Sequence, residues 1–168
     1  GGVGNAVEIV EALEVLKGSG DHRLRELSIA LAVKAAACAN VAVTTETVQG
    51  MLESGAAFER FLRICHAQGA MTPLQIAKPE FSIALKAPTG ERCWWDALAV
   101  AHAASALGAT RQSATSIPDE TASILFHTPD HTWCTAVSDT IATVSGNNLS
   151  RCEHALGLLR TAIRTDDA

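Results

Sequence analysis

The stretch that decides the fold is residues 1–18, GGVGNAVEIVEALEVLKG. A glycine loop over residues 1–4 leads into a pattern that predicts a helix. Asn5 is a suitable N-cap, because its side-chain oxygen can accept a hydrogen bond from a first-turn amide. Glu8 is spaced to reach back and complete a capping-box pair with it. Gly18 then predicts the end of the helix.

A glycine loop in front of a helix N-terminus suits two kinds of ligand. Backbone amides favour an anion, whereas loop carbonyls together with a carboxylate favour a hard cation. Glu11 is the carboxylate that helical spacing places one turn past the loop. Two plainer interpretations remain open: a tight turn into a buried helix, and a surface glutamate that stabilises its helix N-terminus.

The composition points to one globular domain, or one and a half, in 168 residues. Hydrophobic residues make up 48% of the chain and charged residues 18%, so the chain is neither disordered nor a coiled coil. The net charge of -5 comes without a basic cluster, which argues against a nucleic-acid partner. The longest apolar run, residues 29–38, is interrupted by Lys34 and is too short to span a membrane.

The five cysteines are scattered and odd in number, which favours reduced thiols in a cytoplasmic protein. No signal peptide is recognisable. The chain opens inside a turn and without a methionine, so we expect it to be a piece of a longer protein.

The periodicity of residues 1–70 predicts a block of four helices joined by short turns. Asp21 is expected to cap the second helix, and Asn40 to end it in the left-handed conformation. That helix carries apolar residues on most of its faces, which predicts burial on most sides.

A linker and a change of period follow. Pro73 and Pro79 forbid a helix through residues 71–79. Residues 80–168 combine short strands with two helices, which predicts an α+β fold with antiparallel strands. The expected elements are strands at 81–86 and 92–95 joined by a turn at 88–90, a helix from 97 to 107 between Asp96 and Gly108, strands at 122–126 and 140–144, and a helix from 149 to 163.

The histidines and cysteines lack the spacing of a zinc site. Core thiols and surface histidines are the plainer interpretation of the residues considered, which are Cys65, His66, His127, His131, Cys134, Cys152 and His154.

Two other groups of residues are candidates for chemistry. Cys93 precedes Trp94 and Trp95 in a predicted strand, which favours a buried thiol over a nucleophile. One tryptophan is expected in the core, and the other either packs or offers a stacking surface. The acid pairs 119–120 and 166–167 are expected to be solvated charge.

Several segments, in order along the chain, resemble those of the thymidine and pyrimidine-nucleoside phosphorylases. Gly4-Asn5-Ala6-Val7-Glu8 followed by Glu11-Ala12 is similar to the family signature G-N-A-x-E-v-x-E-A. In the first half of the chain, residues 24–32 resemble the family's following helix, residues 53–61 its segment S-G-K-A-x-x-x-F, and residues 67–69 its turn A-Q-x-G. In the second half, residues 86–90 and Asp96 resemble the entry to the family's C-terminal domain, residues 107–111 its motif L-G-x-G-R, and residues 141–144 its strand L-A-T-I.

The resemblance implies both an activity and a fold. These enzymes are homodimers that catalyse reversible phosphorolysis of pyrimidine nucleosides to the free base and a sugar 1-phosphate. Residues 1–70 would be the last helices of their α/β domain, and residues 80–168 their small hammerhead-like α/β domain. The family's phosphate-binding loop and base-binding residues would lie upstream of Gly1, so no catalytic or phosphate-binding residue is expected here.

The resemblance also implies a cation site. Some members bind a potassium ion through loop carbonyls just before G-N-A and through the second Glu of the signature. Those positions are Gly2 and Glu11 here, and a further ligand would precede Gly1. Asn5 argues against the related AMP phosphorylases, which tend to read G-P-A-L-E.

The leading hypothesis is therefore a piece of a pyrimidine-nucleoside phosphorylase that is inactive alone and requires the upstream part of the enzyme. Family glycines are replaced by Ala101, Ala109, Ala122 and Ser138, which also suits a degenerate paralogue. The rival from another class is a non-enzymatic interaction module whose helical block docks an apolar face on a partner. A small metal-binding domain is the third hypothesis.

Overall fold

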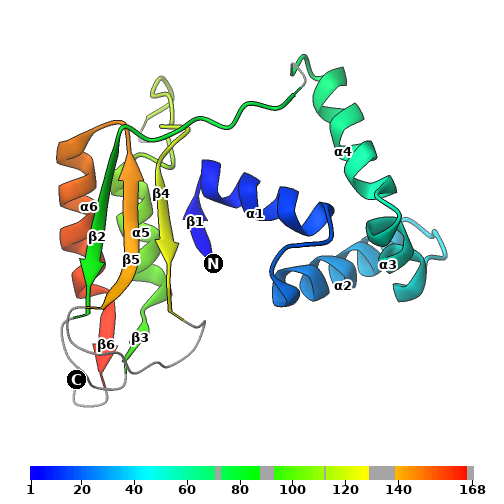
Figure 1. The fold of residues 1–168 in the computed structure, drawn as a ribbon, viewed down its shortest axis with the longest axis horizontal. Helices are drawn as coiled ribbons and strands as arrows, with labels where there is room; N and C mark the ends of the chain where they lie inside the picture. The colour runs from blue at the N-terminus through cyan, green and yellow to red at the C-terminus, as the bar shows by residue number, and fades with distance from the viewer. Residues whose placement is uncertain (71–72, 88–92, 112, 129–138, 166–168) are drawn as a thin grey trace. The chain divides into compact units, whose positions relative to one another are not determined.

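The computed structural model describes residues 1–70, 73–87, 93–111, 113–128 and 139–165. The chain divides into two compact units, whose elements are labelled in Figure 1. The sheet unit comprises Gly1–Glu8 with Ala77–Ala168, and the helical unit comprises Ile9–Ile76. The first residues of the chain thus belong with its C-terminal part, whereas the sequence suggested a single segment over residues 1–70.

The sheet unit contains a four-stranded antiparallel sheet of order β1-β4-β5-β2. Its strands are β1 (Gly2–Gly4), β2 (Phe81–Lys86), β4 (Ser123–Phe126) and β5 (Thr140–Gly146). The predictions of β2, β4 and β5 are confirmed. The prediction of a loop at residues 1–4 is wrong, because Gly2–Gly4 pairs with β4.

One face of this sheet is the core face. Leu85 lies opposite Ala142, and Ile124 lies between Val3 and Val144. Leu85, Ile124 and Val144 are almost inaccessible to solvent. The alternating pattern of β2 therefore places its large apolar side chains on the core face and its remaining side chains on the opposite face, as in a half-buried strand.

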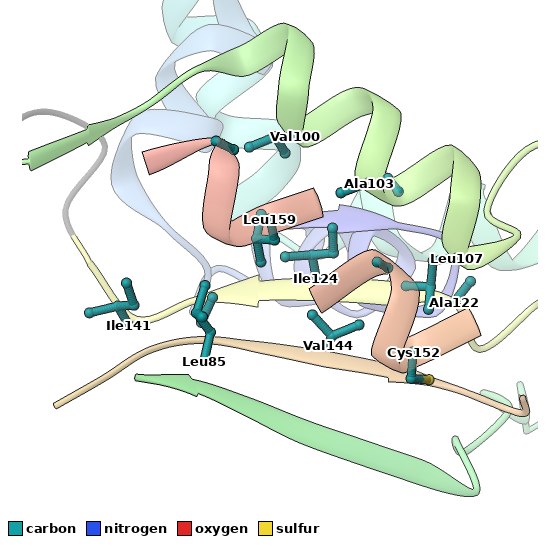
Figure 2. Packing of buried hydrophobic residues seen from close by; sticks show 14 of the residues in the cluster. Leu85, Val100, Ala103, Leu107, Ala122, Ile124, Ile141, Val144, Cys152 and Leu159 are labelled. Atoms are coloured by element: carbon teal, nitrogen blue, oxygen red, sulfur yellow. The ribbon is translucent and has the colours of Figure 1, made fainter. Parts of the chain in front are cut away.

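Two helices, α5 (Ala97–Leu107) and α6 (Leu149–Thr161), cover the core face. Figure 2 shows Leu107, Cys152 and Leu159 directed from the helices toward the sheet, which contributes Ile124 and Val144 to the same buried cluster. All of these side chains are buried. A two-layer arrangement of this kind closes a core without help from another domain.

The ends of α5 are the ones that the sequence predicted. The Asp96 carboxylate accepts a hydrogen bond from the Ala99 amide at 3.0 Å. Gly108 ends the helix in the left-handed region, with φ of 106°. Arg164 Nη2 also lies 2.8 Å from Asp96 Oδ2, which links the start of α5 to the last strand.

A second, two-stranded sheet corrects two predictions. It pairs β3 (Cys93–Trp95) with β6 (Ile163–Thr165). The expected hairpin of strands 81–86 and 92–95 is therefore wrong, because β2 pairs with β5 instead. The final helix ends at Thr161, before the predicted residue 163. The turn at 88–90 and residue 92 lie outside the described residues.

The helical unit contains most of α1 (Ala6–Leu16), followed by α2 (His22–Cys38), α3 (Thr45–Glu53) and α4 (Ala56–Ala67). The predicted block of helices is confirmed. Asp21 Oδ1 accepts from the Leu24 amide at 2.8 Å, and Asn40 has φ of 57°. Residues 73–79 of the expected linker contain neither helix nor strand.

The helical unit buries little of its apolar surface. In the part of it that the structure describes, the buried apolar side chains are Val15, Ile29 and Leu52. Leu27 and Leu31 are each 56% exposed. The prediction that α2 is buried on most sides is therefore wrong in this chain, since α2 packs mainly on α3. No described helix combines the length and the apolar character that a membrane span requires.

Candidate functional site

The strand-to-helix junction at the N-terminus carries the signature residues. The Phe126 amide donates to the Gly1 carbonyl at 2.9 Å, and the Asn5 amide donates to the Ala122 carbonyl at 2.9 Å. Because hydrogen-bonded residues alternate in an antiparallel pair, the backbone N–H and C=O groups of Val3 also face β4. The N–H and C=O groups of Gly2 and Gly4 consequently face the free edge of the sheet.

Glu8 satisfies one of these outward groups. Its Oε1 accepts a hydrogen bond from the Gly4 amide at 2.9 Å. The sequence predicted that Glu8 would reach the Asn5 amide, and that Asn5 would cap α1. The prediction for Glu8 is wrong, because the Asn5 amide donates to the Ala122 carbonyl of the strand ladder.

Asn5 instead uses its side chain as a donor. Nδ2 donates to the Ala109 carbonyl at 3.1 Å and to the Asp119 carbonyl at 2.7 Å. The Ala6 amide adds a bond to the Glu120 carbonyl at 3.0 Å. The beginning of the chain is thereby joined to a loop more than 100 residues away.

Asp119 organises that loop and is not the solvated charge that the sequence suggested. Its Oδ1 accepts from the Thr121 amide at 2.9 Å and from Thr121 Oγ1 at 2.6 Å, and its Oδ2 accepts from the Asn147 amide at 2.9 Å. Partial burial raises the pKa of Asp119, but these hydrogen bonds outweigh that effect and hold the pKa below its ordinary value of 3.8. The spacing D-x-T, typical of an Asx-turn, is the sequence signal that could have identified it.

The two predicted potassium ligands belong to different units. Gly2 lies in β1 of the sheet unit, and its outward carbonyl is a donor of the kind that a hard cation prefers. Glu11 lies in the part of α1 that belongs to the helical unit and is half-buried. Gly2 therefore fits the implied ion, while the complete site stays a prediction.

Histidine and cysteine do not gather into a centre in the described ranges, where no three His, Cys, Asp or Glu side chains are placed to share a metal ion. His127 Nε2 lies 2.9 Å from Thr143 Oγ1. Cys93 is buried, as predicted. Burial raises the pKa of the Cys152 thiol, as do the nearby Asp119 and Glu153 carboxylates, so this thiol is poorly suited to act as a nucleophile.

The other candidate residues from the sequence either lie apart from one another or lie outside the described residues. Cys65 and His66 lie on α4, and His154 is exposed on α6. His131, Cys134, Ser138, Asp166 and Asp167 lie outside the described residues.

The tryptophan pair packs against the buried cluster of the sheet unit. Trp94 and Trp95 are both half-buried against the buried cluster. The Trp95 and Phe126 ring centroids are 4.8 Å apart, and Trp95 Nε1 donates to Thr128 Oγ1 at 3.0 Å. These contacts favour a packing role for Trp95 over a stacking surface.

Comparison with known proteins finds no matching family model. The chain is similar to pyrimidine-nucleoside phosphorylase from Staphylococcus aureus, with 39% identity over 71 residues to the proteins of strains bovine RF122 / ET3-1, USA300 and COL. The match takes in 40% of this chain and 16% of the length of each relative. This partial likeness supports a weak relation between the chain and the pyrimidine-nucleoside phosphorylases.

Proposed function

We propose that this chain is part of a pyrimidine-nucleoside phosphorylase, an enzyme that cleaves pyrimidine nucleosides with phosphate to give the base and a (deoxy)ribose 1-phosphate. The observation that carries the proposal is the 39% identity over 71 residues to the Staphylococcus aureus enzyme. The signature at Gly4–Glu11 supports it. The chain supplies structural support, and the phosphate- and base-binding residues come from the upstream part of the same cytoplasmic, homodimeric enzyme.

A potassium ion is the proposed cofactor, with Gly2 and Glu11 among its ligands. The outward carbonyl of Gly2 supports this assignment, because antiparallel pairing leaves it on the free edge of β1. When bound, such an ion would offset negative charge beside the phosphate-binding region. The contribution of this chain's own residues is to hold the strand-to-helix junction that presents the Gly2 carbonyl.

Exposed apolar side chains in the helical unit support the need for an upstream partner. Leu27 and Leu31 are each 56% exposed, Met51 is 48% exposed and Ile64 is 47% exposed. Burying a side chain of this size contributes about 1.5–3 kcal/mol. Contact of this surface with the missing part of the enzyme would complete the core of the helical unit.

The proposal is tested by assaying the chain with and without an upstream partner. The partner is the part of the Staphylococcus aureus enzyme that precedes the 71 matched residues, co-expressed with this chain. Release of uracil or thymine from uridine or thymidine is measured with phosphate present. We expect no turnover from the chain alone, turnover from the pair, and loss of that turnover with Leu27→Glu.

Two outcomes contradict the proposal. Robust turnover by the chain alone would show that its residues include a complete active site. A pair that assembles with the helical unit but gives no turnover would favour a degenerate paralogue.

The exposed side chains of the helical unit also favour a second candidate, a non-enzymatic interaction module. Size-exclusion chromatography separates the two functions. A stable monomer that does not associate with the upstream segment supports the interaction module, whereas a specific complex that turns over nucleoside supports the phosphorylase.

A further inference from the structure

Two adjacent residues bind one loop segment at the start of the chain. Asn5 Nδ2 donates to the carbonyls of Ala109 and Asp119, at 3.1 and 2.7 Å. The backbone amides of Asn5 and Ala6 donate to the carbonyls of Ala122 and Glu120, at 2.9 and 3.0 Å. Every acceptor is a main-chain carbonyl, and the Asn5 side chain is the only one of these donors that depends on residue type.

A neutral amide is the side chain that suits this position. Its Nδ2 carries two N–H groups, and each has a carbonyl partner here. A carboxylate would set oxygen against two carbonyl oxygens, and alanine would remove both donors. Asn148 offers the opposite case, because its Oδ1 accepts from the Arg151 amide at 3.0 Å, a role that aspartate also performs.

The register of β1 on β4 determines which backbone groups of β1 face outward. With Asn5 bonded to Ala122, Val3 falls opposite Ile124, and the Gly2 carbonyl faces the free edge. A slip of one residue would turn that carbonyl into the ladder with β4. A slip would also place Val3 or Asn5 at the position of Gly4, where a Cβ would lie 2.3 Å from the Ala122 carbonyl oxygen.

We propose that Asn5 is a positioning residue, which sets the register of β1 and thereby directs the Gly2 carbonyl toward the potassium ion. The effect on register is argued from the hydrogen bonds of the sheet unit alone. The effect on the ion rests on the proposed function.

The test compares the same chemical substitution at two asparagines of the full chain. Asn5→Asp replaces a donor with an acceptor, and Asn148→Asp is the matched control in which an acceptor is retained. Hydrogen exchange of the Phe126 amide, which donates to the Gly1 carbonyl, reports the register. We expect exchange at least about tenfold faster in Asn5→Asp and unchanged in Asn148→Asp. Asn5→Ser, which keeps one donor, serves if Asn5→Asp does not fold.

A second readout separates positioning from general stability. The melting temperature of each chain, co-expressed with the upstream part that would carry the further ligand, is measured in KCl and in NaCl at equal ionic strength. We expect the wild-type chain and Asn148→Asp to melt higher in KCl, and Asn5→Asp to show no difference between the salts. A purely structural role for Asn5 would lower the melting temperature equally in both.

The outcomes distinguish the two levels of the proposal. Unchanged exchange at Phe126 in Asn5→Asp overturns the register role. Faster exchange with a surviving potassium effect overturns the link between Asn5 and the ion. Faster exchange with no potassium effect in the wild-type chain overturns the ion in the proposed function and supports Asn5 as the residue that sets the register.

Discussion

The sheet unit and the helical unit use similar aliphatic residues to opposite effect. In the sheet unit, Leu107 and Leu159 are almost inaccessible, because a sheet and two helices enclose them. In the helical unit, Leu27 and Leu31 are more than half exposed. Hydrophobic content alone therefore does not make a core, since burial depends on an opposing layer.

The largest effect of a substitution is expected at the centre of the sheet unit. Leu159→Ala removes a side chain with no exposed area, and we expect it to lower the free energy of unfolding by about 2–5 kcal/mol. Leu149→Ala on the same helix is the control, because Leu149 is 44% exposed. Urea denaturation followed by tryptophan fluorescence reports this unit, which contains all three tryptophans. Equal losses from both variants would contradict the two-layer core.

One glycine in each unit tests how closely the surrounding backbone packs. Gly4 has φ of 136°, and a Cβ there would meet the Ala122 carbonyl oxygen at 2.3 Å, so Gly4→Ala should cost about 2 kcal/mol or more. Gly50 lies within α3 with open space around its Cα, so Gly50→Ala should stabilise its helix by about 0.5–1 kcal/mol. Thermal unfolding followed by circular dichroism measures both. A harmless Gly4→Ala would show that β1 does not approach β4 as closely as described.

Asp119 makes the stability of the sheet unit depend on pH. Its pKa is lower in the folded chain than its ordinary value of 3.8, so its contribution is complete above that value and is lost as pH falls through the folded pKa. Asp119→Asn should cost about 1.5–3 kcal/mol near neutral pH, because hydrogen bonds to a charged group are removed. The difference from wild type should shrink below about pH 4.

Urea titrations between neutral and acidic pH check this dependence. Thr121→Val, which removes the 2.6 Å bond from Thr121 Oγ1, should show a smaller version of the same effect. A difference between wild type and Asp119→Asn that does not vary with pH would contradict the assignment.

The smallest effect is expected on the exposed surface of the helical unit. Leu27→Gln and Leu31→Gln should each change stability by less than about 0.5 kcal/mol in the chain alone, because both side chains already face solvent. Leu52→Ala in the same unit is the control, since Leu52 is 8% exposed and should cost substantially more. Circular dichroism melting compares them. Large losses at Leu27 would indicate that α2 is covered in solution.

Local signals in the sequence predicted most of the elements. Asp21 and Asp96 were identified as caps from residue type and position, and Gly108 and Asn40 as left-handed stops. The alternation of Phe81–Lys86 identified a half-buried strand. These signals succeed because the interactions involved span only a few residues.

The candidate site was predicted less well. The sequence suggested that Asn5 caps α1 and that residue 119 carries solvated charge, whereas Asn5 donates to the carbonyl of Asp119. Asparagine can donate or accept, so its residue type alone does not indicate its role. The glycines at residues 1–4 were interpreted as a loop, because a strand of that composition is recognisable only when its partner is known.

The sequence by itself determined the class of the fold, the helices with their caps, and the strands with strong alternation, because propensity and capping act locally. Only the tertiary structure decided that β2 pairs with β5, that β3 pairs with β6, and that Gly2–Gly4 forms an edge strand secured by Asn5. Strand partners and donor directions depend on which surfaces meet across long sequence separations. These long-range contacts follow from the packing of the whole core, which no local sequence pattern encodes.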